Sequence, residues 1–346
     1  MLKEKKTLAF KGGLNLLDVY PLRFCSIVES VSSDSAPAVF EFHVPGTKIE
    51  HVIVNLCLVE PWALPNWIIL GHKISEFFDK LCEIRTRYFP EATCHLAINN
   101  HDGALVAAAR EYVNNVGWMK VCALEPKYPQ DDPALLAKVL LGRDVRFGSD
   151  TASLGILVLD AQTVSAVYAS CIRGDKVDSR YIVLSGTGLK ENEIIRVQLG
   201  TSLEKLIQSR IQGAWKYRVF VNGPLRGMEI SDLSREIDWD VNSVVVLKEL
   251  DSKVVFPMVK SDEMAFTTNV LGEPRECVCC NFCDDVCPVD LEPALFYRSY
   301  KRGEKHKAWS YNLERCIECG LCSFVCPSKI ELLQIIKECK GTATKP

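Results

Sequence analysis

The sequence Cys277-Val-Cys-Cys-Asn-Phe-Cys-Asp-Asp-Val-Cys-Pro288 shares its spacing with Cys316-Ile-Glu-Cys-Gly-Leu-Cys-Ser-Phe-Val-Cys-Pro327. In both runs three cysteines lie three positions apart, a fourth follows four positions later, and a proline comes directly after it. Three thiolates at this spacing wrap a loop around a [4Fe-4S] cube, and the fourth cysteine ligates the cluster of the other run. Each proline removes a backbone donor and redirects the chain. The doubled spacing predicts two [4Fe-4S] clusters.

The two runs share their ligands in this prediction. One cluster takes Cys277, Cys280, Cys283 and Cys326, and the other takes Cys316, Cys319, Cys322 and Cys287. Pairs of C-x2-C also suit tetrahedral zinc. Zinc does not explain the third cysteine or the fourth with its proline, so iron–sulfur is the preferred interpretation. Cys279 and Cys339 lie outside the spacing, and we expect both to pack as small apolar side chains.

The composition is that of an ordinary soluble protein. The 346 residues are 48% hydrophobic and 25% charged with a formal net charge of -3, which suits roughly two or three domains. This balance argues against nucleic acid as a partner. No signal-peptide pattern opens the sequence, and thiolate-bound clusters need a reducing compartment, so we expect a cytoplasmic location. The remaining cysteines are expected to be buried free thiols: Cys25, Cys57, Cys82, Cys94, Cys122 and Cys171.

Residues 49–174 alternate apolar strands with helices. We expect strands at 52–59, 94–98, 119–124 and 154–159, and helices at 66–88, 103–114, 133–141 and from about residue 162. This alternation predicts an α/β fold with a Rossmann-like parallel sheet covered on both faces. Such sheets bind ligands at the C-terminal ends of their strands, which draws attention to residues 55–61 and to Asp160.

The pattern changes after Gly174. Residues 175–262 suggest strands at 181–184, 194–199, 218–221, 244–247 and 254–256 around a helix at 202–211, which predicts a small unit of β-grasp type. Gly186-x-Gly188 lacks the third glycine of a dinucleotide fingerprint and lies between two strands, so it predicts a turn. Residues 263–346 carry the cysteine runs, and apparent helices at 291–300 and 330–340 predict a helical ferredoxin-like domain. Residues 1–48 form an N-terminal segment.

A basic stretch lies between the two cysteine runs. It contains Arg298, Lys301, Arg302, Lys305 and Lys307. One interpretation is a solvated helix face; the other is a docking patch for an acidic partner that uses electrostatic steering.

Several motifs together resemble the RnfC family of Rnf-type electron transport complexes. That family is related to NqrA of the sodium-pumping NADH:quinone reductase and, more distantly, to the flavoprotein of respiratory complex I. The resemblance covers roughly residues 50 to 340 and depends, besides the second cysteine run, on Asn55-Leu-Cys-Leu-Val-Glu60-Pro61, Lys127-Tyr128-Pro129-Gln130, Leu141-Gly142-Arg143-Asp144-Val145, Gly155-Ile-Leu-Val and Gly223-Pro224-x2-Gly227.

The resemblance implies three domains: Rossmann-like at 49–174, β-grasp of the soluble-ligand-binding (SLBB) type at 175–262, and a two-cluster ferredoxin type at 263–346. It also implies an electron relay at the cytoplasmic face of a membrane. The implied partners are other subunits of a redox complex, embedded in the membrane, and an acidic electron carrier such as ferredoxin or flavodoxin.

This sequence departs from the NADH-oxidising relatives in two respects. Those relatives carry a loop of the form G-R-G-G-x-G-F-P, which is absent from residues 1–50. Flavin-binding relatives also read N-x2-E-x-E-P, and here Leu58 replaces the first glutamate while Asn55 and Glu60 are kept. Asp160 replaces a frequent asparagine, and its carboxylate would repel a phosphate. Asn55 and Glu60 are therefore candidate remnants of a flavin or nucleotide site, and both FMN binding and direct NADH oxidation are disfavoured.

Three functions follow from these patterns. The first is an iron–sulfur electron-transfer subunit of a membrane-associated Rnf/Nqr-type oxidoreductase, which requires no catalytic acid, base or nucleophile. The second is a soluble iron–sulfur adaptor that feeds electrons to a cytosolic reductase. The third is a quinone-binding or scaffold protein resembling NqrA, for which eight cluster-spaced thiols would be unnecessary.

Overall fold

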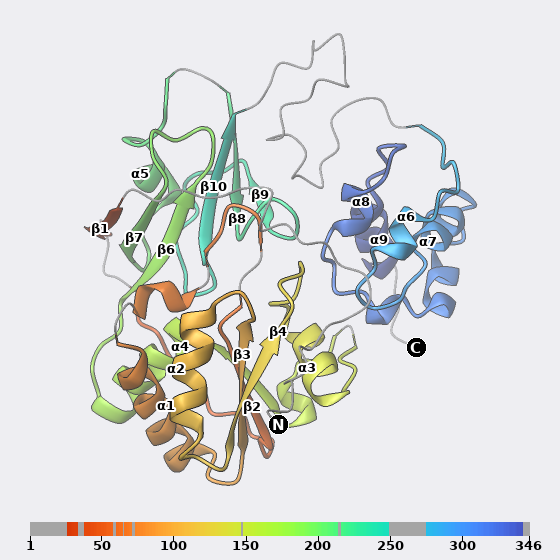
Figure 1. Cartoon of the computed structure of the whole chain (residues 1–346). Helices are drawn as coiled ribbons and strands as arrows, with labels where there is room; N and C mark the ends of the chain where they lie inside the picture. Colours follow the sequence, from red (N-terminus) through yellow and green to blue (C-terminus); the bar gives the residue numbers. More distant parts are fainter. Residues whose placement is uncertain are drawn as a thin grey trace.

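The computed structural model describes residues 26–33, 38–57, 60–64, 66–70, 73–146, 148–213, 216–248 and 275–341. Two sheets and a helical segment carry these residues (Figure 1). The expected strand at 254–256 lies outside the described residues, as does most of the N-terminal segment.

The first sheet is parallel throughout, as predicted. Its strands are β2 (His51–Asn55), β3 (Thr93–Asn99), β4 (Met119–Leu124) and β5 (Ile156–Asp160), in the order β4-β3-β2-β5. The chain adds β3 and β4 on one side of β2 and returns to place β5 on the other. Asn55 and Asp160 end two neighbouring strands in register, so they flank the point where open α/β sheets bind ligands.

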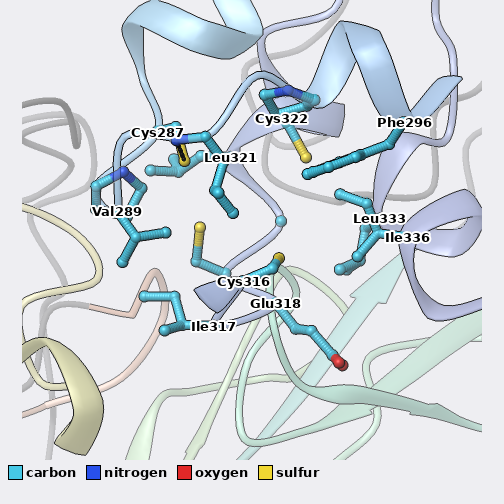
Figure 2. A pocket seen from close by; sticks show the side chains of 15 residues that line it. Cys287, Val289, Phe296, Cys316, Ile317, Glu318, Leu321, Cys322, Leu333 and Ile336 are labelled. Carbon is cyan, nitrogen blue, oxygen red and sulfur yellow. Dashed lines mark hydrogen bonds between the residues drawn. The ribbon is translucent and has the colours of Figure 1, made fainter. Parts of the chain in front are cut away.

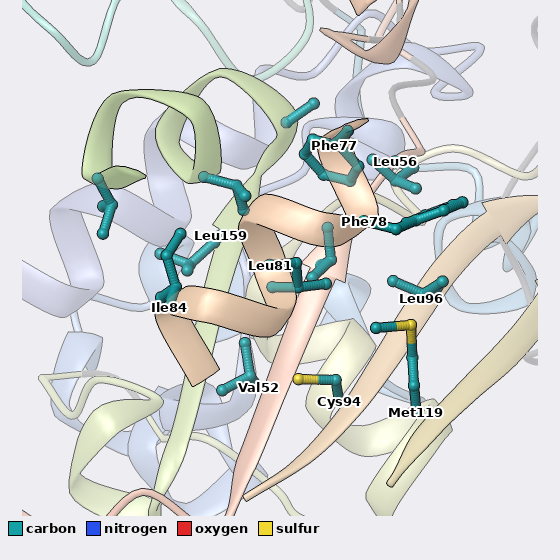
Figure 3. Packing of buried hydrophobic residues seen from close by; sticks show 14 of the residues in the cluster. Val52, Leu56, Phe77, Phe78, Leu81, Ile84, Cys94, Leu96, Met119 and Leu159 are labelled. Carbon is teal, nitrogen blue, oxygen red and sulfur yellow. The ribbon is translucent and has the colours of Figure 1, made fainter. Parts of the chain in front are cut away.

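Helices cover both faces of this sheet. They are α1 (Ile74–Tyr88), α2 (Gly103–Val113), α3 (Pro133–Leu141) and α4 (Ala161–Val167). Successive strand side chains point to opposite faces: Val52 and Val54 pack with Leu81 of α1, whereas Ile53 packs with Leu136 of α3. Figure 3 shows the α1 side of this core. All these side chains are buried, which explains the near-continuous apolar strands.

Two predicted boundaries in this part were wrong. The expected helix at 66–88 is a 3-10 turn, Asn66–Leu70, followed separately by α1. The first strand ends at Asn55 rather than at residue 59. The Asn55 side-chain oxygen accepts a hydrogen bond from the Cys57 backbone N–H at 3.0 Å, which gives that donor a partner outside the sheet.

The second sheet is mixed and has the order β1-β7-β6-β10-β8-β9. Its strands are β1 (Ser26–Val31), β6 (Ser179–Ser185), β7 (Glu193–Gln198), β8 (Tyr217–Val221), β9 (Met228–Ile230) and β10 (Ser243–Lys248), and α5 (Leu203–Ile207) packs on it. The edge strands β1 and β9 were not predicted. β1 comes from the N-terminal segment and pairs in parallel with β7, so that segment contributes to this sheet.

The helix α5 is shorter than expected because the chain leaves it to pair elsewhere. Ile211 forms a bridge with Leu189, and the Gln212 N–H donates to the Gly188 carbonyl at 2.8 Å. At the same turn Gly186 has a φ of 124°, and a Cβ there would collide with the backbone of Val246. The Gly186-x-Gly188 pair therefore lets a turn approach β10 closely.

The cysteine-rich segment is helical in its described residues 275–341. It contains α6 (Phe282–Asp285), α7 (Pro293–Lys301), α8 (Leu321–Phe324), α9 (Leu332–Gly341) and 3-10 turns at Lys305–Tyr311 and Leu313–Arg315. Its own core includes Phe296, Leu313 and Ile336. Ion pairs from Lys138 to Asp290 and from Arg315 to Asp144 join it to α3 and the loop that follows.

Among the described residues, none of the helices combines the length and the apolar character that crossing a bilayer requires.

Candidate functional site

The two cysteine runs have the same backbone turns at matching positions. Cys279 and Glu318 have φ values of 55° and 56°, Asn281 and Gly320 of 62° and 80°, and Asp290 and Lys329 of 53° and 56°. This left-handed conformation is uncommon outside glycine. Its recurrence at three matched places indicates that both loops curl in the same way, as a pair of equivalent ligand loops would.

Each predicted ligand set lines its own cavity. The first, which we call the inner cavity, is lined by Cys287, Cys316, Cys319 and Cys322. Figure 2 shows that the labelled cysteines come from both runs and surround the same space, with Phe296, Leu333 and Ile336 beside them. The second, the outer cavity, is lined by Cys277, Cys280, Cys283 and Cys326. In both cavities three cysteines of one run meet the fourth of the other.

The chemistry of the inner cavity suits a cationic cluster held by sulfur. Burial raises the pKa of the Cys316 thiol to about 11 and raises the pKa values of Cys319 and Cys322 well above their usual range. Thiolates there need a compensating positive charge. Bound iron ions would supply that charge and so favour the deprotonated form of their thiol ligands. In the outer cavity, burial and the neighbouring Asp284 carboxylate together raise the pKa of the Cys283 thiol to about 12.

A single metal ion is a different case. Within the described part of the chain, no three His, Cys, Asp or Glu side chains are grouped so that they could hold one ion. A four-iron cluster is larger than a single ion, so its four ligands lie farther apart and line a shared cavity around it.

The two cavities differ in their exposure. Val278 and Phe282, in the first run, are 67% and 54% exposed, and Cys280 is exposed. Cys322 is buried, and the inner loop packs through Leu321 against Tyr128 and Leu225 of the two sheet-bearing parts. The outer cavity therefore lies at the surface, and the inner one faces the rest of the protein.

The cysteines outside the ligand spacing divide into two groups. Cys339 is fully buried, as expected, but Cys279 is exposed, so the expectation that it packs as an apolar side chain was wrong. The Arg298 guanidinium donates to its sulfur at 3.2 Å. Among the other thiols Cys57 and Cys94 are buried, while Cys82, Cys122 and Cys171 are half-buried. Cys25 lies outside the described residues.

Asn55 and Glu60 are occupied by contacts within the protein. The Asn55 amide donates to the Asp131 carbonyl at 2.9 Å. Glu60 is 2% exposed, accepts from the Leu225 backbone N–H at 2.9 Å, and lies 3.6 Å from the Arg226 Nε. Burial raises the pKa of Glu60 to about 7, against the opposing effect of Arg226. Asn55 thus connects the end of β2 to the loop before α3, and Glu60 connects the segment after β2 to the loop after β8.

Asp160, which replaces a frequent asparagine, and the two aspartates that follow β4 also have partners within the protein. The Asp160 carboxylate caps α4 by accepting from the Thr163 N–H at 2.6 Å. Asp131 and Asp132 pair with Arg226 in the same region. The C-terminal edge of the sheet thus carries three carboxylates, of which Asp131 and Asp132 share the Arg226 guanidinium.

The basic stretch has acidic neighbours of its own. Lys301 pairs with Glu276 at 3.3 Å, Lys305 with Glu338 at 3.0 Å and Lys307 with Glu304 at 2.7 Å. These pairs reduce the positive field that an acidic partner would meet, which favours the solvated-face interpretation for the three lysines. Docking of an acidic carrier at Arg298 and Arg302 stays a prediction.

Sequence reasoning gave no site role to Tyr128 or Lys340. The Tyr128 hydroxyl donates to the Cys319 carbonyl at 2.6 Å, and the Lys340 ammonium donates to the Cys316 carbonyl at 2.7 Å. Tyr128 lies in one of the motifs that carried the family resemblance, so a signal for it was present. Lys340 had none, because a lysine near the end of a helix is usually solvated.

Comparison with known proteins agrees with these observations. Residues 276–330 match the family described as a 4Fe-4S dicluster domain. The chain is 25% identical over 306 residues to the C subunit of the ion-translocating oxidoreductase complex of Pasteurella multocida, covering 88% of this chain and 34% of that protein. It is 27% identical over 298 residues to the corresponding protein of Haemophilus influenzae strain PittEE, covering 85% and 42%.

A third relative, the same component in Buchnera aphidicola, is 24% identical over 71% of this chain and 49% of its own length. The chain thus spans a third to a half of these curated relatives. A crystal structure of an NAD+-reducing [NiFe]-hydrogenase in the air-oxidized state has a similar fold, with a TM-score of 0.53 and 14% identity over 85% of this chain and 57% of that one. The resemblance to the RnfC proteins of ion-translocating oxidoreductase complexes is therefore confirmed, and the cysteine-rich segment carries iron–sulfur chemistry of the 4Fe-4S type.

Proposed function

We propose that this chain is an electron-transfer subunit of a membrane-associated Rnf/Nqr-type oxidoreductase and relays electrons through two [4Fe-4S] clusters. The observation that carries the proposal is that each cavity is lined by one predicted ligand set, with three ligands from one run and the fourth from the other. This is the shared ligation that the doubled spacing requires.

The proposal assigns four ligands to each cavity. Cys277, Cys280, Cys283 and Cys326 hold the outer cluster, and Cys287, Cys316, Cys319 and Cys322 hold the inner one. Each cluster supplies reversible one-electron transfer when bound. Apolar side chains such as Phe296 and Ile336 limit water at the inner site, and no residue needs to act as acid, base or nucleophile.

The difference in exposure gives the two clusters different roles. The outer one lies behind the exposed Val278 and Phe282 and exchanges electrons with an external redox protein. The inner one faces the sheet-bearing parts. The partners in this proposal are other subunits of a membrane-bound redox complex and an acidic carrier such as ferredoxin or flavodoxin, and the chain acts peripherally at the cytoplasmic face of the membrane.

The proposal also divides the chain into three domains. Residues 49–174 form the Rossmann-like domain, residues 175–262 a β-grasp (SLBB-type) domain, and residues 263–346 the ferredoxin-type domain. Each described part has apolar cores of its own, and these support this division. β1 joins residues 26–31 to the second domain.

We further propose that the chain relays electrons without FMN and does not oxidise NADH itself. The internal contacts of Asn55, Glu60 and Asp160 support this, as does the absence of the glycine-rich loop from residues 1–50. Phosphate groups in such sites are usually held by backbone N–H groups of that kind of loop.

Anaerobic purification followed by iron, acid-labile sulfide, zinc and flavin analysis tests the proposal. Two clusters require about eight irons and about eight sulfides per chain, and we expect no bound flavin. A colourless protein that contains zinc and has no reducible paramagnetic centre would overturn it.

Paired alanine substitutions test how the ligands are shared. Cys280→Ala with Cys326→Ala removes two ligands of one cluster, so about four irons should remain. Cys319→Ala with Cys326→Ala damages both clusters, and nearly all iron should be lost. If the first pair loses all iron and Cys283→Ala with Cys287→Ala keeps about half, each run would hold its own cluster instead.

A further inference from the structure

An ion pair with a buried lysine lies beside the inner ligand loop. Lys340, near the end of α9, has a side chain that is 3% exposed. Its ammonium donates to the Cys316 carbonyl at 2.7 Å and to the Glu318 carboxylate at 2.7 Å. Both acceptors belong to the segment that begins at one predicted ligand of the inner cluster and ends at the next. A buried ammonium is costly unless it has such partners.

The matching position of the outer loop is built differently. Glu318 and Cys279 occupy equivalent places in the two runs and have nearly the same φ. At the outer loop a cysteine stands there in place of a carboxylate, and its sulfur accepts a hydrogen bond from the exposed Arg298. Only the inner loop combines a carboxylate at this position with a buried cation, among the residues that the structure describes. The charged groups beside the two loops therefore differ: the inner loop has the Lys340–Glu318 pair, and the outer loop has Arg298 at Cys279 and Asp284 at Cys283.

We propose that the Lys340–Glu318 pair sets the reduction potential of the inner cluster relative to the outer one, with Lys340 raising it and Glu318 lowering it. The inference rests on the proposed function, since it needs both clusters. Reduction adds one negative charge to a cluster, and net charge and burial are among the factors that set its potential. A nearby cation stabilises the reduced form and a nearby anion destabilises it.

The burial of the pair decides how strongly each charge acts. Lys340 is almost fully enclosed, so salt and water screen it little, whereas the Glu318 side chain is 31% exposed. The ammonium should therefore dominate, and the pair as a whole should favour the reduced inner cluster. In Figure 2 the Glu318 side chain points away from the space that the cysteines surround. Its carboxylate therefore lies farther from the inner cavity than the Glu318 backbone does.

The test measures both midpoint potentials in the complete chain by EPR-monitored redox titration at one pH. The inner signal is identified as the one that Cys287→Ala abolishes. Lys340→Met should shift the inner midpoint to more negative values, Glu318→Gln should shift it to more positive values, and the double variant should lie between them. The outer midpoint should stay unchanged in all three.

Lys305→Met is the matched control, because it removes a lysine that pairs with Glu338 of α9 at a half-exposed site. It should move neither midpoint. If Lys340→Met fails to assemble its inner cluster, Glu318→Gln decides alone: a positive shift confined to the inner cluster supports the proposal. An unmoved inner midpoint in Glu318→Gln, or equal shifts in both clusters, overturns it. Absence of cluster signals from the wild-type protein would instead contradict the proposed function.

Discussion

The Tyr128 hydroxyl donates a 2.6 Å hydrogen bond to the backbone carbonyl of Cys319, a residue 191 positions away in the chain. Tyr128 follows the last strand on one side of the parallel sheet and is fully buried. It packs with Leu225, Val286 and Leu321, so the first sheet, the loop after β8 and the cysteine-rich segment meet at this side chain. The contact fixes the inner ligand loop against the rest of the protein.

Tyr128→Phe should loosen that loop. The substitution leaves the Cys319 carbonyl without its buried donor, which costs about 1–2 kcal/mol. We expect a lower free energy of unfolding in urea and faster hydrogen exchange at the backbone amides of residues 319–324. Tyr88→Phe is the control, since its hydroxyl donates to the Cys171 carbonyl at 3.2 Å, away from the ligand loops. It should leave exchange in 319–324 unchanged; equal exchange in both variants would contradict the assigned role of Tyr128.

Glu60 should make the stability of the protein depend on pH. Its pKa is raised by burial from 4.5 to about 7, so between these values the folded state binds more protons than the unfolded state. Stability is therefore fully present below about pH 4.5 and falls as the pH rises through about 7, by roughly 3 kcal/mol. Glu60→Gln cannot ionise, and urea unfolding between pH 5 and 8 should show a flatter profile for it.

Glu91→Gln serves as the control for that experiment. Glu91 is an exposed carboxyl whose pKa is lowered by a hydrogen bond from Lys48, so its replacement should leave the decline between pH 5 and 8 in place. A wild-type profile that rises over this interval, or a Glu60→Gln profile identical to it, would show that Glu60 is ionised throughout.

The outer cluster should be the more vulnerable of the two. Cys280 is exposed at the surface, whereas Cys322 is buried and the inner loop packs against Tyr128 and Leu225. Treatment with ferricyanide should therefore remove the outer EPR signal first, because cluster exposure controls access by an oxidant. The signal that survives should be the one that Cys287→Ala abolishes. Loss of both signals at the same rate would contradict the difference in exposure.

Gly186→Ala should be strongly destabilising. The new Cβ would collide with the backbone of Val246, and the φ of 124° already strains any other residue. We expect a loss of about 3 kcal/mol or more in the free energy of unfolding. Gly174→Ala is the control, because it has a φ of 76° with open space around the added carbon and should cost only about 1–2 kcal/mol. Equal losses would mean that the close approach to β10 has little effect.

Local patterns were sufficient for much of the fold. Apart from the helix expected at 66–88 and the end of the first strand, the apolar strands and amphipathic helices between residues 52 and 167 lie close to where their periodicity predicts them, since each buries its own apolar face whatever its neighbours are. Elements with weak local signals were missed. β9 has three residues and largely exposed side chains, and an edge strand of this kind forms only because β8 offers it hydrogen-bond partners.

The spacing of the cysteines in the sequence determined the kind of metal chemistry, because the distance between ligands along one loop is fixed by covalent geometry. It could not determine what surrounds those loops. That Cys279 is exposed, that Glu60 pairs with Arg226, and that Lys340 is buried against Cys316 and Glu318 depends on contacts between residues far apart in the chain. Only the tertiary structure decides such contacts, because burial and charge pairing arise when separate elements pack together, and no local pattern encodes the partner.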